Sequence, residues 1–225
     1  MSANPEPQSR AGKAPVKPPA RCSRTAGATR GSILRAATAV FARHGYDGGS
    51  VEKISNRAGS VDRMIYYYFG SKEGLFIEVI EGIYDRMNQA ESKLKLDLSE
   101  PVESLIELIR FMIGYYRRHP EFVTLLNTEN LHNGQHIAKS TRAREYSSPA
   151  VSLIGKLLES GVRQKVFRKD IGARDLYLLI AATGYFYMSN RHTLSAFLGE
   201  DLLAADAVAH WENFVIDTVL RAVAA

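Results

Sequence analysis

Residues 50–69 read SVEKISNRAGSVDRMIYYYF, and this stretch decides the fold. Its apolar residues form two short stripes with helical spacing, one before and one after Gly59. A glycine between two short helices permits the tight turn that a helix-turn-helix needs. The stretch therefore predicts a helix-turn-helix in which Ser50 caps the first helix and the second spans about Asp62 to Tyr68.

The second of these helices is expected to keep its outer face bare. Ile65 and Phe69 lie four residues apart on the inner side, and the positions directed outward or to the flanks are Arg63, Met64, Tyr66 and Tyr67. An arginine can bind guanine O6 and N7, and a tyrosine hydroxyl can donate to a phosphate. The tyrosines at 66–68 could instead be core aromatics, but three in a row on one helix cannot all face inward. We therefore interpret the outer face as a DNA-reading surface.

Helical periodicity continues on both sides of this stretch. Before it, a stripe begins at Thr29, a candidate N-cap, and stops near Gly45; after it, Ser71 caps a long helix that reaches Met87. Further helices are expected at 101–119, 121–131, from Gln135 or Ser148 to 161, at 173–190, near 195 and at 202–223. With little β-alternation anywhere, the sequence predicts an all-α protein with a three-helix head (29–74) continuous with a larger helical body (75–225).

Charge is distributed unevenly along the chain, whose formal net charge is +5. Residues 1–72 hold 12 Lys and Arg against 4 Asp and Glu, whereas the rest is mildly acidic. A basic end attached to an acidic body indicates a polyanionic partner for that end, although a basic tail kept for solubility would look similar. Residues 1–28 combine prolines, small residues and scattered cations, so we expect a disordered basic arm that adds nonspecific DNA contacts.

Several features favour a soluble cytoplasmic protein. Cys22 is the only cysteine, which excludes an intrachain disulfide and disfavours a redox switch. The first residues lack the apolar segment of an export signal, and the most hydrophobic run, 176–188, is too short to span a membrane. No phosphate-binding loop, nucleophile elbow or acid–base pair is present, so we expect neither an enzyme nor a cofactor.

Three residues near 130 have a spacing that could suit a metal site. Glu129, His132 and His136 are spaced i, i+3 and i+7, which would align them on an unbroken helix. Gly134 lies within the triplet and is expected to end the helix. We therefore favour hydrogen-bonded or exposed histidines and predict no metal.

The head resembles the DNA-binding domain of the TetR family over residues 29–76, about a fifth of the chain. The residues that carry the resemblance are Thr29-Arg30-x-x-Ile33-Leu34-x-Ala36-Ala37-x-x-x-Phe41-x-x-x-Gly45-Tyr46, Ser50-Val51-x-x-Ile54-x-x-Arg57-Ala58-Gly59 and Tyr66-x-Tyr68-Phe69-x-Ser71-Lys72-Glu73-x-Leu75-Phe76. The resemblance implies a homodimeric, ligand-responsive repressor bound to an inverted-repeat operator. A DNA-binding activator or architectural protein with the same head remains the alternative.

The resemblance also implies roles for single residues of the head. Thr29, Ser50 and Lys72 would contact phosphates, Arg63 and Met64 would read bases, and Tyr66 with Tyr67 or Tyr68 would touch backbone or thymine methyls. One departure is notable: the family commonly has Gly-Val-Ser at the turn, whereas this chain has Gly59-Ser60-Val61. We therefore expect Asp62 or Ser60 to cap the recognition helix.

For the body, the resemblance implies a small-molecule site and dimerisation through the last two long helices. The dimer candidates are Leu176, Leu179, Trp211, Phe214, Val215 and Val219, with a simple monomer core as the alternative. Effector candidates are polar or aromatic groups in apolar stretches, although each could equally be a satisfied core group: Tyr115, Asn127, Asn130, His132, Tyr185, Tyr187, Asn190 and Arg191. An arginine near tyrosine and asparagine would suit a small aromatic acid or a heterocycle.

Overall fold

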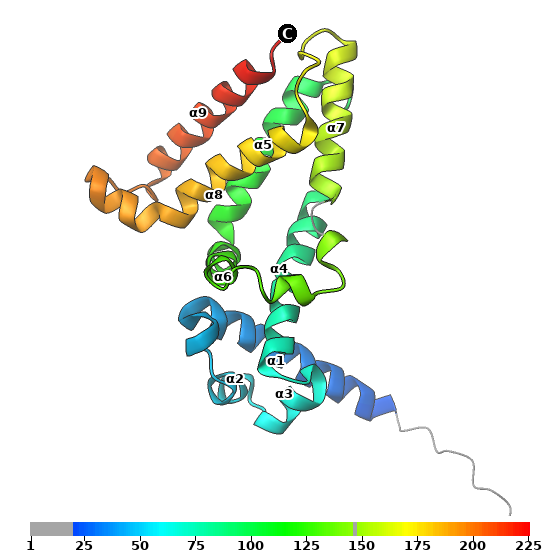
Figure 1. Ribbon diagram of the computed structural model, residues 1–225, viewed down its shortest axis with the longest axis vertical. Helices are drawn as coiled ribbons and strands as arrows, with labels where there is room; N and C mark the ends of the chain where they lie inside the picture. Colours follow the sequence, from blue (N-terminus) through cyan, green and yellow to red (C-terminus); the bar gives the residue numbers. More distant parts are fainter. Residues whose placement is uncertain (1–19, 146–147) are drawn as a thin grey trace, which may run out of the picture.

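A computed structural model describes residues 20–145 and 148–225 (Figure 1). The described residues form nine α-helices and two short 3-10 helices, without a β-strand, which confirms the all-α prediction. The helices are α1 (Ala20–Gly48), α2 (Val51–Ala58), α3 (Asp62–Phe69), α4 (Lys72–Glu91), α5 (Pro101–Arg118), α6 (Pro120–Leu131), η1 (Ile137–Lys139), η2 (Ala143–Glu145), α7 (Ser148–Arg163), α8 (Ala173–Leu198) and α9 (Ala205–Val223). No helix within these ranges is both long and apolar enough to cross a lipid bilayer.

The head consists of α1, α2 and α3, and its turns form at the predicted residues. The Ser50 hydroxyl accepts a hydrogen bond from the Lys53 backbone N–H at 3.2 Å, which caps α2. Gly59 ends α2 with a φ of 61°, a left-handed conformation that glycine adopts without steric cost. Gly45, with a φ of 68°, interrupts α1 where the apolar stripe was expected to stop. The predicted helix-turn-helix is thus confirmed, with its cap at Ser50 and its turn at Gly59.

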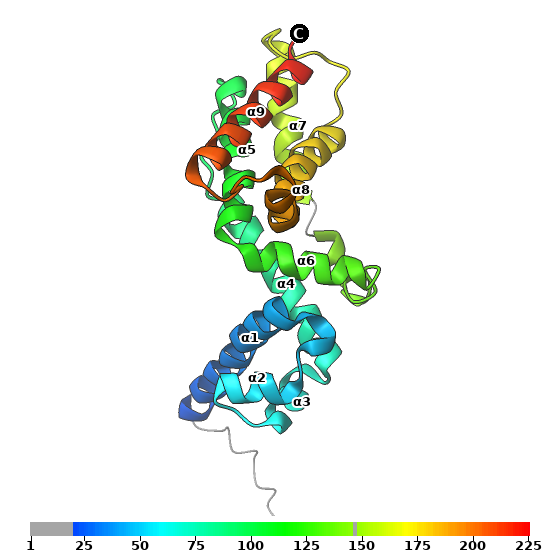
Figure 2. The same ribbon diagram turned by 90° about the vertical axis from the view of Figure 1, so that its left-hand side faces the viewer.

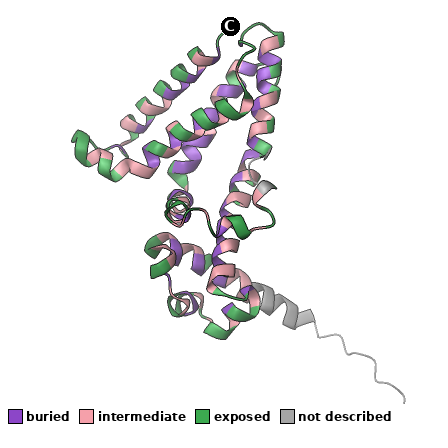
Figure 3. Ribbon diagram, in the orientation of Figure 1, coloured by how far each residue is buried: buried purple, intermediate pink, exposed green. Residues whose placement is uncertain are grey.

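Helix α4 connects the head to the body. Its N-cap is Ser71, whose hydroxyl accepts from the Gly74 N–H at 2.9 Å, and it runs from beside α1 and α3 into the body (Figure 1). One apolar core follows it: Phe41 of α1, Phe76 of α4 and Phe122 of α6 belong to the same cluster of buried side chains. Buried residues occur in both the head and the body, and along α4 between them (Figure 3). The head and the body therefore share a core instead of packing separately.

The body is arranged around α5, which contacts α7, α8 and α9 (Figure 2). Gly184 brings α8 close to α5, because a Cβ there would lie 3.3 Å from both Ile113 and the Tyr116 ring. A second cluster of buried side chains, which includes Ile113 and Val215, fills the far end. Helix α6 lies between the head and the body (Figures 1 and 2).

Two expectations about helix ends were wrong, and so was the expected disorder of residues 20–28. Helix α1 begins at Ala20, so Thr29 lies inside it and is no N-cap; the segment 20–28 is helical, while residues 1–19 lie outside the described part. Composition predicted disorder there, but the backbone continues the amphipathic helix that follows. Helix α8 continues to Leu198 instead of ending at Asn190, so the helical turn expected near Ser195 is part of it. Of the two starts considered for α7, Ser148 is the observed one. The Cys22 side chain is not described.

Candidate nucleic-acid interface and internal cavity

The outer face of α3 is exposed, as the sequence predicted. Ile65 is fully buried and Phe69 is 8% exposed, whereas Tyr66 and Tyr67 are 53% and 76% exposed. Arg63 is exposed as well. Arg63, Met64, Tyr67 and Tyr68 line a shared surface hollow. The structure thus brings together four of the predicted DNA-contacting residues on one side of one helix.

The start of α3 differs from the sequence expectation. The residue at the N-cap is Val61, and no side-chain cap hydrogen bond forms, so the predicted cap by Asp62 or Ser60 was wrong. The Asp62 carboxylate instead accepts a hydrogen bond from the Ser55 hydroxyl of α2. With Val61 at the N-cap, the Asp62 side chain does not cap α3 and instead links α3 to α2 through Ser55. A carboxylate in the first turn also interacts favourably with the helix dipole.

The predicted phosphate-binding residues, Ser50, Lys72 and Thr29, lie in different surroundings. Ser50 lies at the N-terminus of α2, where backbone N–H groups favour an anion. The Lys72 ammonium lies 4.5 Å from the centre of the Tyr46 ring and donates to the Asp47 carbonyl at 3.5 Å. Thr29 is half-buried within α1, away from any helix end. Lys53 is a cation that the sequence reasoning missed; its ammonium donates to the Gly48 carbonyl at 2.9 Å.

A buried pair of a carboxylate and an imidazole lies where α6 meets the head. His136 Nδ1 is 2.7 Å from Glu129 Oε2, and Glu129 Oε1 accepts from the backbone N–H groups of His136 and Ile137, both at 2.9 Å. The His136 ring is 4.4 Å from the Tyr46 ring of the head and 4.9 Å from the Phe76 ring of α4. Glu129 and His136 therefore bind each other, and within the described residues no three potential ligands gather as a metal site would require.

The 3-10 segment that follows is tied along α4. Lys139 pairs with Glu73, and the Arg142 guanidinium pairs with the Asp85 carboxylate at 2.8 Å. The pairing with Lys139 lowers the pKa of Glu73. These exposed pairs are individually weak, but together they hold residues 137–145 against α4.

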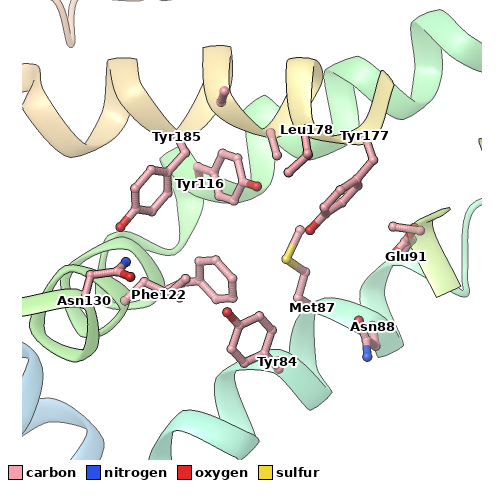
Figure 4. A pocket seen from close by; sticks show the side chains of 14 residues that line it. Tyr84, Met87, Asn88, Glu91, Tyr116, Phe122, Asn130, Tyr177, Leu178 and Tyr185 are labelled. Carbon is pink, nitrogen blue, oxygen red and sulfur yellow. The ribbon is translucent and has the colours of Figure 1, made fainter. Parts of the chain in front are cut away.

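A cavity of about 280 Å³ lies between α4, α5, α6 and α8 (Figure 4). It is mainly apolar and rich in aromatic rings, and its lining residues are Tyr84, Met87, Asn88, Glu91, Tyr116, Phe122, Leu126, Asn130, Ala150, Tyr177, Leu178, Ala181, Ala182 and Tyr185. Burial raises the pKa of Tyr84 to about 12 and also raises the pKa of Tyr116, so both phenols stay neutral.

Among the described residues that line the cavity, Glu91 is the one with a carboxyl group. Glu91 is only 5% exposed to solvent, and its Oε1 has no hydrogen-bond partner among the described residues. Burial raises its pKa to about 7. Sequence reasoning missed Glu91, although a signal existed: it follows Met87 by four residues and so continues the apolar stripe of α4.

Of the predicted effector residues, Asn130 and Tyr185 line the cavity. Asn127 lies beside them, since its Oδ1 accepts from the Tyr185 hydroxyl at 2.5 Å. The others have different neighbours. The Tyr115 ring lies beside the His119 ring, and His132 lies 3.6 Å from Asp47 of the head. Three residues of α8 donate hydrogen bonds to backbone carbonyls: Tyr187 to that of Leu202, Asn190 to that of Phe186 and Arg191 to that of Met188.

The predicted dimer residues divide into two groups. Leu176, Val215 and Val219 are at most 2% exposed and belong to the core of the single chain. Leu179 and Phe214 are 36% and 54% exposed, and Trp211 is half-buried. Leu178 and Phe186 of α8 are further exposed apolar residues on the same helix. An exposed apolar surface of this kind is typical of an interface.

Comparison with known proteins agrees with this architecture. A family model described as "Bacterial regulatory proteins, tetR family" matches residues 33–79, and one described as "Tetracyclin repressor-like, C-terminal domain" matches residues 101–219. The chain is 53% identical to the HTH-type transcriptional repressor NicS of Pseudomonas putida, over 86% of this chain and 91% of NicS. It is 30% identical to the repressor SCO4008 of Streptomyces coelicolor, over 69% of this chain and 76% of SCO4008.

A solved TetR family regulator from Marinobacter aquaeolei has the same fold. It superposes with a TM-score of 0.65 and 20% identity, over 90% of this chain and 98% of that one.

Proposed function

The chain belongs to the TetR family and is a DNA-binding transcriptional repressor, and on that premise we propose how it reads its operator and how it is released. The proposed reading surface is the outer face of α3. Arg63 would bind a guanine edge, and Tyr67 would contact the phosphate backbone or a thymine methyl. The exposure of Arg63, Tyr66 and Tyr67 beside the buried Ile65 supports this assignment.

We propose that two chains bind DNA together through α8 and α9. The exposed Leu179 and Phe214 support this interface, since a monomer would leave both in water. A two-fold dimer presents its recognition helices to major-groove sites about one helical turn apart. The operator is therefore expected to be an inverted repeat, bound in the cytoplasm where the bacterial chromosome lies.

Release is proposed to begin in the internal cavity. The observation that carries this step is the course of α4: its C-terminal half contributes Tyr84, Met87 and Glu91 to the cavity wall, while its N-terminal end lies in the head. A ligand that fits the cavity better when α4 is displaced shifts the dimer toward a state whose heads no longer match the operator. The released fraction is then set by the difference in ligand affinity between the two states.

The test starts with DNA selected from a random-sequence library by the full-length protein. Selection should return an inverted repeat, and Arg63→Ala should lose it. The matched control is Arg174→Ala, an exposed arginine at the start of α8, which should select the same sequence. Selection of no consensus by the unmodified protein, or of the same consensus by Arg63→Ala, would contradict the proposed reading surface.

A further inference from the structure

Glu91 places a carboxylate in a cavity that offers it no partner. Its Oε1 is buried without a hydrogen bond among the described residues, and burial is the sole cause of its raised pKa. A buried acceptor without a donor costs free energy that a fold normally avoids. In the view of Figure 4, Glu91 and Asn88 lie at one end of the cavity and Asn130 lies at the other, with the rings between them.

The space between these ends suits a flat molecule. Five of the lining residues are aromatic: Tyr84, Tyr116, Phe122, Tyr177 and Tyr185. The volume of about 280 Å³ exceeds the roughly 150 Å³ of a cavity that holds benzene, so a bicyclic ring system fits. Aromatic walls favour stacked or edge-on rings.

The charge of the lining residues distinguishes an anionic aromatic ligand from one that carries a hydrogen-bond donor. Lys, Arg and His are absent from the described lining residues, and the arginine that favoured an aromatic acid on sequence grounds, Arg191, donates instead to the Met188 carbonyl. An anionic ligand would therefore meet the Glu91 carboxylate without a cation to neutralise it. A ligand with a hydrogen-bond donor would satisfy Oε1, and its ring would be stabilised by the aromatic walls.

We propose that the effector is a planar nitrogen heterocycle or aromatic amine that donates an N–H hydrogen bond to Glu91 Oε1. This inference rests on the proposed function, which assigns the cavity to the effector. It predicts pH dependence too: an N–H donor prefers the ionised carboxylate, so binding should tighten as pH rises from about 6 to about 8. The titratable groups facing Glu91 across the cavity are phenols, Tyr84, Tyr116 and Tyr177, whose raised pKa values keep them neutral in this range.

The experiment uses indole and benzofuran, which have nearly the same shape but carry N–H and O, respectively, at the same ring position. Their affinities for the full-length protein are measured by calorimetry at pH 8. A hydrogen bond to a charged acceptor contributes about 1.5–3 kcal/mol, so indole should bind roughly tenfold or more tightly than benzofuran.

Three variants locate the donor preference. Glu91→Met removes the acceptor and should reduce the indole-to-benzofuran ratio to near one, whereas Glu91→Gln keeps an acceptor oxygen and should retain part of it. Glu107→Met, which removes an exposed carboxylate of α5 that does not line the cavity, is the matched control and should leave the ratio unchanged. Circular dichroism and operator binding confirm that each variant is folded.

The proposed N–H donor would be refuted by equal binding of the two probes or by a preference for indole that survives in Glu91→Met. It would also be refuted if benzofuran-2-carboxylate bound more tightly than indole, or if indole did not bind at millimolar concentration. Operator release, measured separately, distinguishes the two proposals. Release by benzofuran-2-carboxylate that is blocked by the cavity-filling Ala181→Phe would refute the N–H donor but support the effector cavity. Glu91-dependent indole binding that leaves DNA affinity unchanged would support the donor and refute the effector role.

Discussion

The carboxylate of Glu129 holds His136 by both its side chain and its backbone N–H, at 2.7 and 2.9 Å, in a pair that is buried against the head. The pair fixes the turn after α6 so that the His136 ring packs on Tyr46 and Phe76. Through Tyr46 it joins the body to α1 of the head, and through Phe76 it packs on the first turns of α4.

Removing this carboxylate should destabilise the protein. Glu129→Ala leaves the imidazole and two backbone N–H groups buried without an acceptor, so we expect a loss of about 2–3 kcal/mol in the free energy of unfolding, measured by urea denaturation. The matched control is Glu121→Ala, which breaks a partly exposed Glu–His pair at 3.2 Å and should cost less than about 1 kcal/mol. Equal losses in the two variants would show that burial of the Glu129 pair is unimportant.

Glu91 should make stability depend on pH. Burial raises its folded-state pKa from 4.5 to about 7, so the folded state holds the proton more tightly than the unfolded state. The wild type therefore loses stability relative to Glu91→Gln as pH rises from about 4.5 to about 7, by up to about 3 kcal/mol, and not beyond. Urea midpoints of both proteins at pH 5 and pH 8 measure this; a difference that is the same at both pH values would contradict it.

Arg63 should determine sequence preference. Arg63→Ala is expected to weaken binding by about 1–3 kcal/mol per half-site and to relax discrimination at one base pair of each half-site. Anisotropy titrations on operators substituted one base pair at a time provide the measurement. A uniform loss over all substituted operators would instead assign Arg63 to the phosphate backbone.

Lys72 should act on affinity without sequence preference. Lys72→Ala is expected to weaken binding to all duplexes alike and to reduce the slope of log K against log salt by about 2 per dimer, one phosphate contact per chain. Lys165→Ala is the control, since this lysine lies in the body after α7 and should leave the slope unchanged. An unaltered slope in Lys72→Ala would limit the residue to its packing on Tyr46.

Phe214 should be needed for dimerisation. Phe214→Glu places a charge on an apolar residue that is 54% exposed in the single chain, and sedimentation should then show monomers that bind the operator weakly. Leu131→Glu, at an 81% exposed leucine that ends α6, is the control and should remain dimeric. Dimers in the Phe214 variant would place the interface elsewhere.

The head was predictable because its signals are local. Ser50, Gly59 and Ser71 each set a helix end through atoms a few residues away, so the sequence alone locates them. The cap of α3 was mispredicted because the partner of Asp62, Ser55, lies on the preceding helix. Local rules do not describe a hydrogen bond between two helices.

The cavity was harder to predict because its walls come from distant parts of the chain. Tyr84, Tyr116 and Tyr185 belong to α4, α5 and α8, and each has an ordinary place in an amphipathic pattern. Asn130 and Tyr185 were found as polar or aromatic groups in apolar stretches, but the same rule selected Asn190 and Arg191, whose side chains bind the carbonyls of their own helix. Packing between helices separates these cases, and single-sequence patterns do not report it.

The apolar cluster that includes Phe41, Phe76 and Phe122 has a consequence for protein engineering. Severing the chain after α3 would expose rings that the body now covers, so a transplanted reading module needs the first turns of α4 and a substitute for α6. Heat should likewise melt the whole molecule in a single cooperative step, without an early transition belonging to the DNA-reading end.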